Sequence, residues 1–177
     1  MLLERDNLRA RAVEPEDAVP MWEMETDKDQ WRFNGMTAPF SMLNLREYAN
    51  TYEADPFAAG QLRLMVELDG AGDESPEIVG MVDLYDISAQ NRTAFVGIYV
   101  RPGFRSKGYG RKMVAMIAEY AFRILNLKVL AAKVVEGNEE SKALFEDCGF
   151  ELAGTMRSWI ETYGERRDLY IYQNMKL

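Results

Sequence analysis

The chain contains no histidine and a single cysteine, Cys148, among its 177 residues. The absence of histidine excludes histidine-based acid–base catalysis and most zinc sites. One cysteine permits neither an internal disulfide nor a cysteine-based metal cluster. No apolar run approaches the length of a membrane span, and the N-terminus is charged too early for a signal peptide. These features predict a metal-free, cytoplasmic protein that binds no membrane.

Net positive charge is also lacking, since the formal net charge is −8. A nucleic-acid-binding protein normally needs a basic face, so nucleic acid is not expected as a partner. The acidity is compatible with cationic substrates such as amines, although many cytosolic proteins are this acidic simply for solubility. The length predicts one domain over residues 1–177, large enough for a proper core.

The most informative segment is a basic, glycine-containing loop over residues 101–110, Arg-Pro-Gly-Phe-Arg-Ser-Lys-Gly-Tyr-Gly. It follows a strand-like run and precedes a helix-like run. Gly108 and Gly110 carry no Cβ and can adopt positive φ, so backbone N–H groups there can approach a ligand closely. The following helix adds unpaired N–H groups and a positive dipole end. The loop is therefore predicted to bind an anion, most naturally a pyrophosphate.

Two common phosphate-binding motifs do not fit this loop. A P-loop requires a lysine after its second glycine, and Tyr109 occupies that position. A Rossmann fingerprint requires a third glycine, and Met113 occupies that position. What remains is the pattern Arg105-x-x-Gly108-x-Gly110 between an apolar strand and an amphipathic helix.

Periodicity and turn residues predict an α/β (α+β) fold with a mixed sheet and helices on both faces. The predicted strands cover residues 7–13, 61–68, 77–87, 91–100, 128–135, 150–159 and 168–175. The predicted helices cover a segment from Glu14 through Met24, then residues 44–53, 111–125 and 138–147. Residues 33–40 are predicted to form a loop, and residues 69–76 a long acidic hairpin connection.

The loop pattern resembles the acetyl-CoA pyrophosphate loop of the GNAT N-acetyltransferases, Arg/Gln-x-x-Gly-x-Gly/Ala. The segment Asn138–Phe150, Asn-Glu-Glu-Ser-Lys-Ala-Leu-Phe-Glu-Asp-Cys-Gly-Phe, is similar to the second signature of that family. The nearest resemblance is to the branch that holds the spermidine N-acetyltransferases and the RimJ/RimL-type N-terminal acetyltransferases. It implies the GNAT fold, with a mostly antiparallel sheet of about seven strands, splayed at the centre and flanked by about four helices. It also implies acetyl-CoA as the cofactor.

The resemblance further implies which residues bind the cofactor. Backbone N–H groups of the loop would hold the pyrophosphate, Ile98 to Val100 would pair with pantetheine as an added strand would, and Asn138 would hydrogen-bond the pantetheine arm. Gly97 inside a strand suggests a bulge that separates this strand from residues 128–135 and admits that arm. The full predicted set is Ile98, Tyr99, Val100, Arg105, Ser106, Lys107, Gly108, Tyr109, Gly110, Asn138, Ser141 and Phe145.

In many family members a tyrosine in the second signature protonates the leaving thiolate, and here Phe145 stands at that position. A phenyl ring has no proton to give. Ser141, one helical turn earlier, is the predicted proton donor. An equally weighted interpretation makes Ser141 a helix-surface serine that contacts CoA. Weaker candidate donors are Tyr109, Tyr163 and Tyr170.

The amine nucleophile must lose a proton, which a carboxylate or a water chain can accept. Asp83 is the predicted base, because it lies on a central strand, where a carboxylate is costly unless solvated or paired. A structural hydrogen bond is the alternative interpretation. Glu25 and Glu67 are less favoured as bases.

A polyamine-like small amine is the favoured acceptor, with a peptide N-terminus as the alternative. Spermidine-type relatives carry an acidic pair before a proline, whereas Thr37 and Ala38 precede Pro39 here. The surrounding loop is instead aromatic and apolar, which suits either packing or an acceptor with apolar character; it contains Trp31, Phe33, Met36 and Phe40.

Two further possibilities follow from the same resemblance. Because Phe145 replaces the tyrosine, a non-catalytic acyl-CoA-binding domain is the rival from another class. Relatives are often dimers or larger, so a homo-oligomer is a possible assembly. An acyl-enzyme on Cys148 is not favoured, since no histidine can activate the thiol and a buried filler is the simpler role.

Overall fold

One sheet organises the chain in this computed structural model, which describes residues 3–34, 38–69 and 75–176. Its eight strands lie in the order β1-β2-β3-β4-β5-β6-β8-β7. Neighbours are antiparallel except for β5 and β6, which are parallel. The prediction of a mixed, mostly antiparallel sheet is confirmed, with the two-residue β1 as an additional strand. The strands are β1 (Glu4–Arg5), β2 (Leu8–Ala12), β3 (Leu62–Leu68), β4 (Glu77–Ser88), β5 (Thr93–Val100), β6 (Val129–Val135), β7 (Glu151–Thr162) and β8 (Glu165–Met175).

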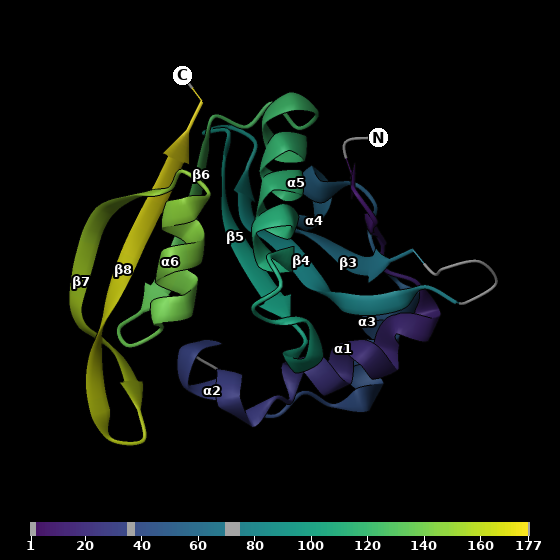
Figure 1. Ribbon diagram of the computed structural model, residues 1–177, viewed down its shortest axis with the longest axis horizontal. Helices are drawn as coiled ribbons and strands as arrows, with labels where there is room; N and C mark the ends of the chain where they lie inside the picture. Colours follow the sequence, from purple (N-terminus) through teal and green to yellow (C-terminus); the bar gives the residue numbers. More distant parts are fainter. Residues whose placement is uncertain (1–2, 35–37, 70–74, 177) are drawn as a thin grey trace.

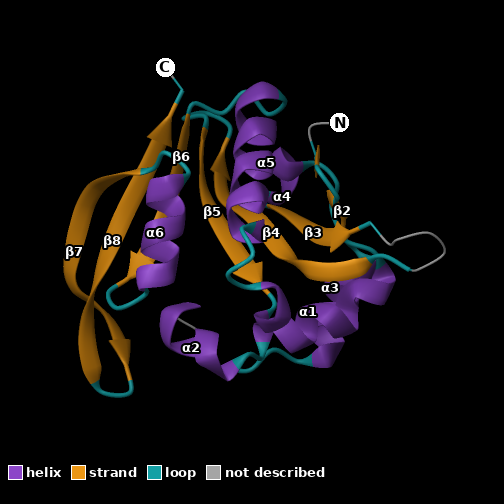
Figure 2. Cartoon of the chain, in the orientation of Figure 1, coloured by secondary structure: helices purple, strands orange, loops and turns teal. Residues whose placement is uncertain are grey.

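Helices cover both faces of the sheet (Figure 2). The described residues form α1 (Ala18–Glu25), α2 (Lys28–Asn34), α3 (Met42–Asn50), α4 (Pro56–Ala59), α5 (Tyr109–Arg123) and α6 (Glu139–Asp147), with 3-10 turns at Pro15–Asp17 and Pro102–Phe104. The sequence did not predict α2 or α4. The prediction of a loop over 33–40 is wrong at its start, because α2 continues to Asn34. Residues 35–37, and residues 70–74 of the predicted acidic connection, lie outside the described residues.

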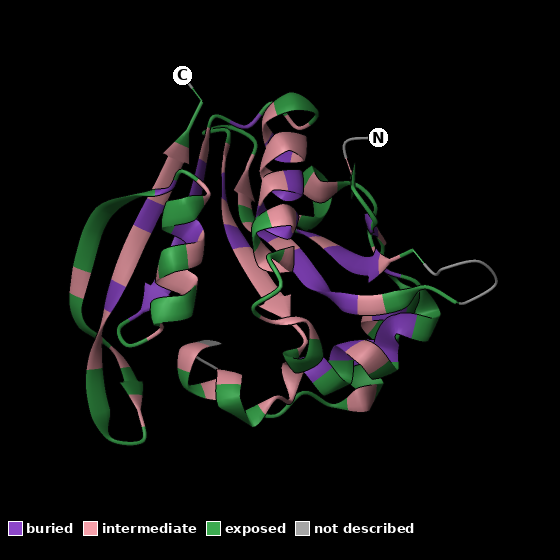
Figure 3. Cartoon of the chain, viewed as in Figure 1, coloured by how far each residue is buried: buried purple, intermediate pink, exposed green. Residues whose placement is uncertain are grey.

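Successive side chains of β3 belong alternately to two hydrophobic cores. Leu64 and Val66 belong to the core under α5, whereas Met65 belongs to the core shared with α1 and α3. Successive side chains of a strand point to opposite faces, so these cores lie on opposite sides of the sheet. Figure 3 shows the buried residues along the central strands and on the turns of α1 and α5 that face them.

The sheet opens at its centre. Pairing between β5 and β6 covers only Thr93–Phe95 against Val129–Ala131. Beyond Phe95 the two strands diverge, so that β6, β8 and β7 form a separate wing (Figure 1). The predicted splay is therefore confirmed, and the rest of β5 has no strand beside it on that edge within the described residues.

The predicted bulge at Gly97 is wrong. Gly97 pairs in register with Asp83, and the register of the β4–β5 ladder shifts instead between Tyr85 and Ser88, where Asp86 has a φ of 51°. Gly97 instead lies beside two side chains of β4, and a Cβ would meet both at ordinary contact distances. A Cβ there would lie 3.5 Å from Tyr85 Cε1 and 3.6 Å from Asp83 Cβ.

Candidate active site

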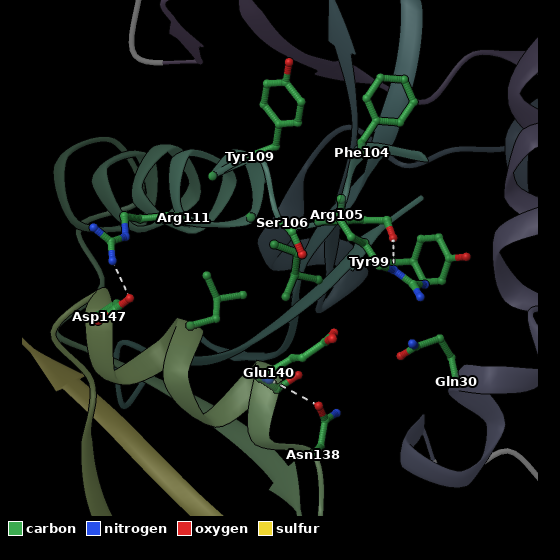
Figure 4. Close-up of a pocket in the computed structure, with 16 residues that line it drawn as sticks. Gln30, Tyr99, Phe104, Arg105, Ser106, Tyr109, Arg111, Asn138, Glu140 and Asp147 are labelled. Atoms are coloured by element: carbon green, nitrogen blue, oxygen red, sulfur yellow. Dashed lines mark hydrogen bonds and ion pairs between the residues drawn. The ribbon is translucent and has the colours of Figure 1, made fainter. Parts of the chain in front are cut away.

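A cavity of about 440 Å³, here called the loop cavity, lies between the end of β5 and the N-terminal ends of α5 and α6 (Figure 4). It brings together most of the predicted cofactor-binding residues: Ile98, Tyr99, Val100, Arg105, Ser106, Gly108, Tyr109, Gly110, Asn138 and Ser141. The remaining two predicted residues do not line it. Lys107 is exposed and its ammonium donates to the Gly103 carbonyl over 2.8 Å. Phe145 is only 3% exposed and lies deeper.

The backbone of the loop is shaped to present N–H groups. Ser106 has a φ of 59° and Gly108, the N-cap of α5, a φ of 79°. A side chain is strained in this left-handed region, which favours glycine at position 108. At Gly110 a Cβ would lie 3.4 Å from Leu144 Cδ2, so α6 packs closely on the first turn of α5. The helix N-terminus and the loop therefore form a compact cradle for an anion.

The Arg105 side chain is directed into the protein. Its Nε donates to the Val100 carbonyl over 2.9 Å and its Nη2 to Asp27 Oδ2 over 3.1 Å. The Tyr99 hydroxyl donates to the same Asp27 oxygen over 2.6 Å. Burial opposes ionisation of Asp27, but the hydrogen bonds from Tyr99, the Asp29 amide and Arg105 outweigh it, so the pKa of Asp27 lies below its usual value. Asp27 thus joins β5 and the loop to the start of α2.

A second cavity of about 370 Å³, here called the sheet cavity, lies where the sheet opens. It shares five lining residues with the loop cavity: Gln30, Ile98, Tyr99, Asn138 and Ser141. Its other walls come from both wings of the sheet and from α1, α2 and α6: Met24, Glu25, Phe33, Arg63, Met81, Asp83, Tyr85, Val96, Gly97, Lys133, Val135, Phe145, Ile160 and Leu169. The opening between β5 and β6 therefore joins the two cavities.

Charged side chains cluster on one wall of the sheet cavity. Arg63, Asp83 and Gly97 form a row across β3, β4 and β5. Arg63 donates from Nε and Nη2 to the two Asp83 oxygens over 2.9 and 2.8 Å, and its Nη1 lies 2.8 Å from Glu25 Oε1. Burial disfavours the charge of Arg63, but the attraction of Asp83 and Glu25 is stronger, so the pKa of Arg63 lies above its usual value.

The structure distinguishes the candidate catalytic residues by position. Ser141 lies in the first turn of α6, where its amide donates to Asn138 Oδ1 over 3.2 Å, and it lines both cavities. Tyr163 is 86% exposed at the β7–β8 turn, and Tyr109 points away from α6 (Figure 4). Glu67 accepts hydrogen bonds from Arg9 and Arg11 and lines neither cavity. Among the candidate hydroxyl and carboxyl groups in the described residues, Ser141, Asp83 and the less favoured Glu25 line the sheet cavity.

Sequence reasoning missed Gln30, Arg63, Tyr85 and Lys133, all of which line the sheet cavity. The sequence did contain a signal for Gln30. Aspartate is a good N-cap, so a helix that begins after Asp27 and has Gln30 in its first turn could have been predicted. In the structure the Asp27 carboxylate accepts from the Asp29 amide over 3.0 Å at the start of α2. A charged residue inside an apolar strand also marked Arg63 as unusual. The pairing of Arg63 with Asp83 depends on the β3–β4 register, which the sequence alone does not state.

The family model of the acetyltransferase (GNAT) domain matches residues 7–151. The chain belongs to this family. Among curated relatives, the N-acetyltransferase YokL of Bacillus subtilis is 29% identical over 164 residues, covering 92% of this chain and 86% of the relative. The spermidine N(1)-acetyltransferase of Vibrio cholerae is 30% identical over 108 residues, covering 59% of this chain and 62% of the relative.

A further relative, the L-methionine sulfoximine/L-methionine sulfone acetyltransferase of Pseudomonas paraeruginosa, is 30% identical over 106 residues, covering 58% of this chain and 61% of the relative. Among solved structures, the spermidine N-acetyltransferase of Vibrio cholerae in complex with CoA and spermine has a TM-score of 0.85 at 24% identity. That match covers 97% of this chain and 96% of the other and confirms the fold.

The family establishes the activity class. The chain is a GNAT N-acetyltransferase, and acetyl-CoA is the acetyl donor of this family, so both predictions are confirmed. None of the helices in the described ranges is long and apolar enough to cross a membrane.

Proposed function

We propose that this chain transfers the acetyl group of acetyl-CoA directly to a small primary amine, with the cofactor in the loop cavity and the amine in the sheet cavity. The observation that supports this is the shared wall of the two cavities. Ile98, Asn138 and Ser141 border both, at the point where β5 and β6 separate. A donor and an acceptor in adjoining cavities meet there, and holding two reactants together removes much of the entropic barrier to their reaction.

The loop cavity fits the pyrophosphate and pantetheine of CoA. The proposed pyrophosphate ligands are the backbone N–H groups from Ser106 to Gly110, where glycine at positive φ keeps the cradle free of side chains. The β5 edge from Val96 to Val100, which has no strand partner toward β6 in the described residues, is proposed to pair with the pantetheine amides. Asn138, at the mouth of both cavities, is proposed as a further hydrogen-bonding partner.

Acetyl-CoA supplies an activated acetyl group, whose C–S bond breaks as the amine nitrogen bonds to the carbonyl carbon. The amine gives up one proton and the thiolate takes up one. We assign the first proton to Asp83, directly or through water, because its side chain is 22% exposed within the sheet cavity. We assign the second to the Ser141 hydroxyl, because Ser141 lines both cavities, and the serine takes a proton from water as it gives its own to the thiolate, so that no alkoxide is left.

The finer acceptor classes stay predictions. A polyamine-like amine has the support of the named spermidine acetyltransferases among the relatives. A protein N-terminus has the support of the putative ribosomal N-acetyltransferase YdaF of Bacillus subtilis, which is 31% identical over 99 residues. A cytoplasmic location and a homo-oligomer likewise stay predictions.

Thiol release tests the proposal. The protein is incubated with acetyl-CoA and a panel of spermidine, amino acids, aminoglycosides and short peptides, and free CoA is followed with a thiol reagent. We expect turnover on at least one amine. We expect Ser141→Ala to lower kcat about tenfold or more, while Tyr163→Phe, at an exposed site, leaves it unchanged.

The base assignment needs its own comparison. We expect Asp83→Asn to lower kcat about tenfold or more, whereas Asp69→Asn, at an exposed position beyond β3, leaves kcat unchanged. Full activity in Asp83→Asn would remove Asp83 as the base. Tight CoA binding without turnover on any amine would favour the non-catalytic acyl-CoA-binding domain.

A further inference from the structure

The charges that line the sheet cavity cancel. Its described lining contains two acids, Glu25 and Asp83, and two bases, Arg63 and Lys133. Both acids already contact Arg63, at 2.8 Å or slightly more. Lys133 has no contact with this cluster and belongs to β6, on the other wing of the sheet. A cavity with separated acidic and basic walls suits a ligand that carries both charges.

Lys133 is held at the cavity wall by aromatic rings. Its Nζ lies 4.3 Å from the ring centroid of Phe95 and 5.4 Å from that of Tyr85, and the two rings stack with centroids 5.5 Å apart. Such cation–π contacts fix the position of an ammonium group without neutralising it. The nearest carboxylate oxygen is Asp86 Oδ2 at 3.8 Å, on a side chain that is 67% exposed, so the pair is weak.

Apart from Gln30, Asn138 and Ser141 at the junction with the loop cavity, the other side chains that line the cavity are mostly apolar or aromatic. Phe33 of α2, Ile160 of β7 and Leu169 of β8 line it, together with Met24 and Val135. A small ligand with a hydrocarbon body would be desolvated by these side chains. The Glu25–Arg63–Asp83 cluster holds two acids and one base, so its net charge of −1 suits a single ammonium group. A polyamine carries several ammonium groups, and Lys133 would repel those that lie beyond the cluster.

We infer that the acceptor is a zwitterionic amine: a small molecule with a primary amine, an acid group and an apolar body, of which a neutral amino acid is the simplest example. Its amine faces the Glu25–Arg63–Asp83 cluster and its acid group faces Lys133, which is the specificity-determining residue. This inference rests on the proposed function, because it names the substrate class of the same cavity.

Matched pairs of acceptors test the inference. Leucine is compared with 3-methylbutylamine, methionine with 3-(methylthio)propylamine and 6-aminohexanoate with hexylamine, so that only the acid group differs and its distance from the amine varies. We expect at least one acid-bearing member to have a kcat/KM about tenfold above that of its partner. In Lys133→Met, which keeps the apolar stem, this ratio falls to about one, because the kcat/KM of the acid-bearing member drops toward that of its plain-amine partner. Lys128→Met, an exposed lysine just before β6, leaves the ratio as in the wild type.

Calorimetry gives a readout that needs no turnover. The preferred zwitterion is titrated into the CoA-saturated protein, and Lys133→Met should weaken its Kd about tenfold while the Kd for CoA stays the same. Lys133→Gln repeats the test if Lys133→Met folds poorly. The kcat/KM ratios of the matched acceptors on the wild-type protein test the inference without any variant.

Two failures are distinguishable. If spermidine is a better substrate than every zwitterion, or if the ratio survives in Lys133→Met, the inference is overturned and the proposed function stands. If no amine releases thiol from a protein that binds CoA, the proposed function fails. Zwitterion binding that depends on Lys133 would then still support the cavity's specificity.

Discussion

The loop cavity and the sheet cavity are built in opposite ways. Most of the loop cavity comes from one stretch of the chain, residues 98–111, and from one side of α6 with its N-cap. The sheet cavity takes its walls from nine different helices and strands, from α1 to β8. The first depends on backbone conformation and the second on side chains that meet only when the sheet forms. This difference predicts which substitutions disturb the donor and which disturb the acceptor.

The largest effect is expected where the backbone itself makes the site. In Gly108→Val a β-branched residue replaces glycine at a φ of 79°, which forces the start of α5 to rearrange. We expect the Kd for CoA to rise about tenfold or more. Gly103→Val is the matched control, because neither glycine has another heavy atom within 4 Å of its Cβ position and only Gly108 has positive φ. Equal affinities of the two variants for CoA, measured by calorimetry, would contradict a backbone cradle.

A smaller effect, on the other cavity, is expected at Gly97. A Cβ at this position meets Tyr85 and Asp83 at ordinary contact distances of 3.5 Å and more, so Gly97→Ala should fold normally. The added methyl group takes up space beside Asp83 in the sheet cavity. We expect the acceptor KM to rise about fivefold and the Kd for CoA to stay within twofold. A change in CoA affinity with an unchanged acceptor KM would show that the two cavities are wrongly assigned.

The different construction of the two cavities also explains which site residues could be predicted from the sequence. The glycines and Asn138 act through local backbone geometry, so their spacing along the chain located the loop cavity and most of its lining. Arg63 and Lys133 act through partners more than a dozen residues away, on strands whose register is set by the whole sheet. Asp83 was predicted from its own position, because a carboxylate on a central strand is costly unless it is solvated or paired. The bulge was misplaced because an in-strand glycine signals a close approach as readily as a register shift.

Asp27 lines neither cavity, but it contacts Arg105 of the loop cavity and Tyr99, which lines both cavities. Substituting Asp27 therefore tests whether the two cavities can be disturbed independently. In Asp27→Asn the contacts to Tyr99 and Arg105 weaken, and α2 with Gln30 loses its tie to the loop. We expect both the CoA Kd and the acceptor KM to rise about threefold, and the free energy of unfolding to fall by about 1–2 kcal/mol. Asp29→Asn, exposed in the same helix, should change none of these.

The pH dependence of stability checks the same contact. The pKa of Asp27 is lower in the folded protein than in the unfolded chain, where it is about 3.9. The contacts of its carboxylate therefore stabilise the fold fully at pH values above the unfolded pKa. This stabilisation is lost as the pH falls through the folded pKa. The stability curves of the wild type and Asp27→Asn should therefore differ at neutral pH and converge in acid. Curves that stay parallel down to the acid limit would indicate that Asp27 is not ionised in these contacts.

The smallest effect is expected at Cys148, which lines neither cavity. It is the C-cap of α6, and burial raises the pKa of its thiol, while Arg111 lowers it less. A neutral thiol away from both cavities is a poor nucleophile. We expect Cys148→Ser to keep kcat within twofold and mass spectrometry of the wild type with acetyl-CoA to show no acetylated enzyme. An acetyl adduct on Cys148 that an amine then discharges would replace direct transfer with a two-step reaction, and would make the junction of the two cavities irrelevant to catalysis.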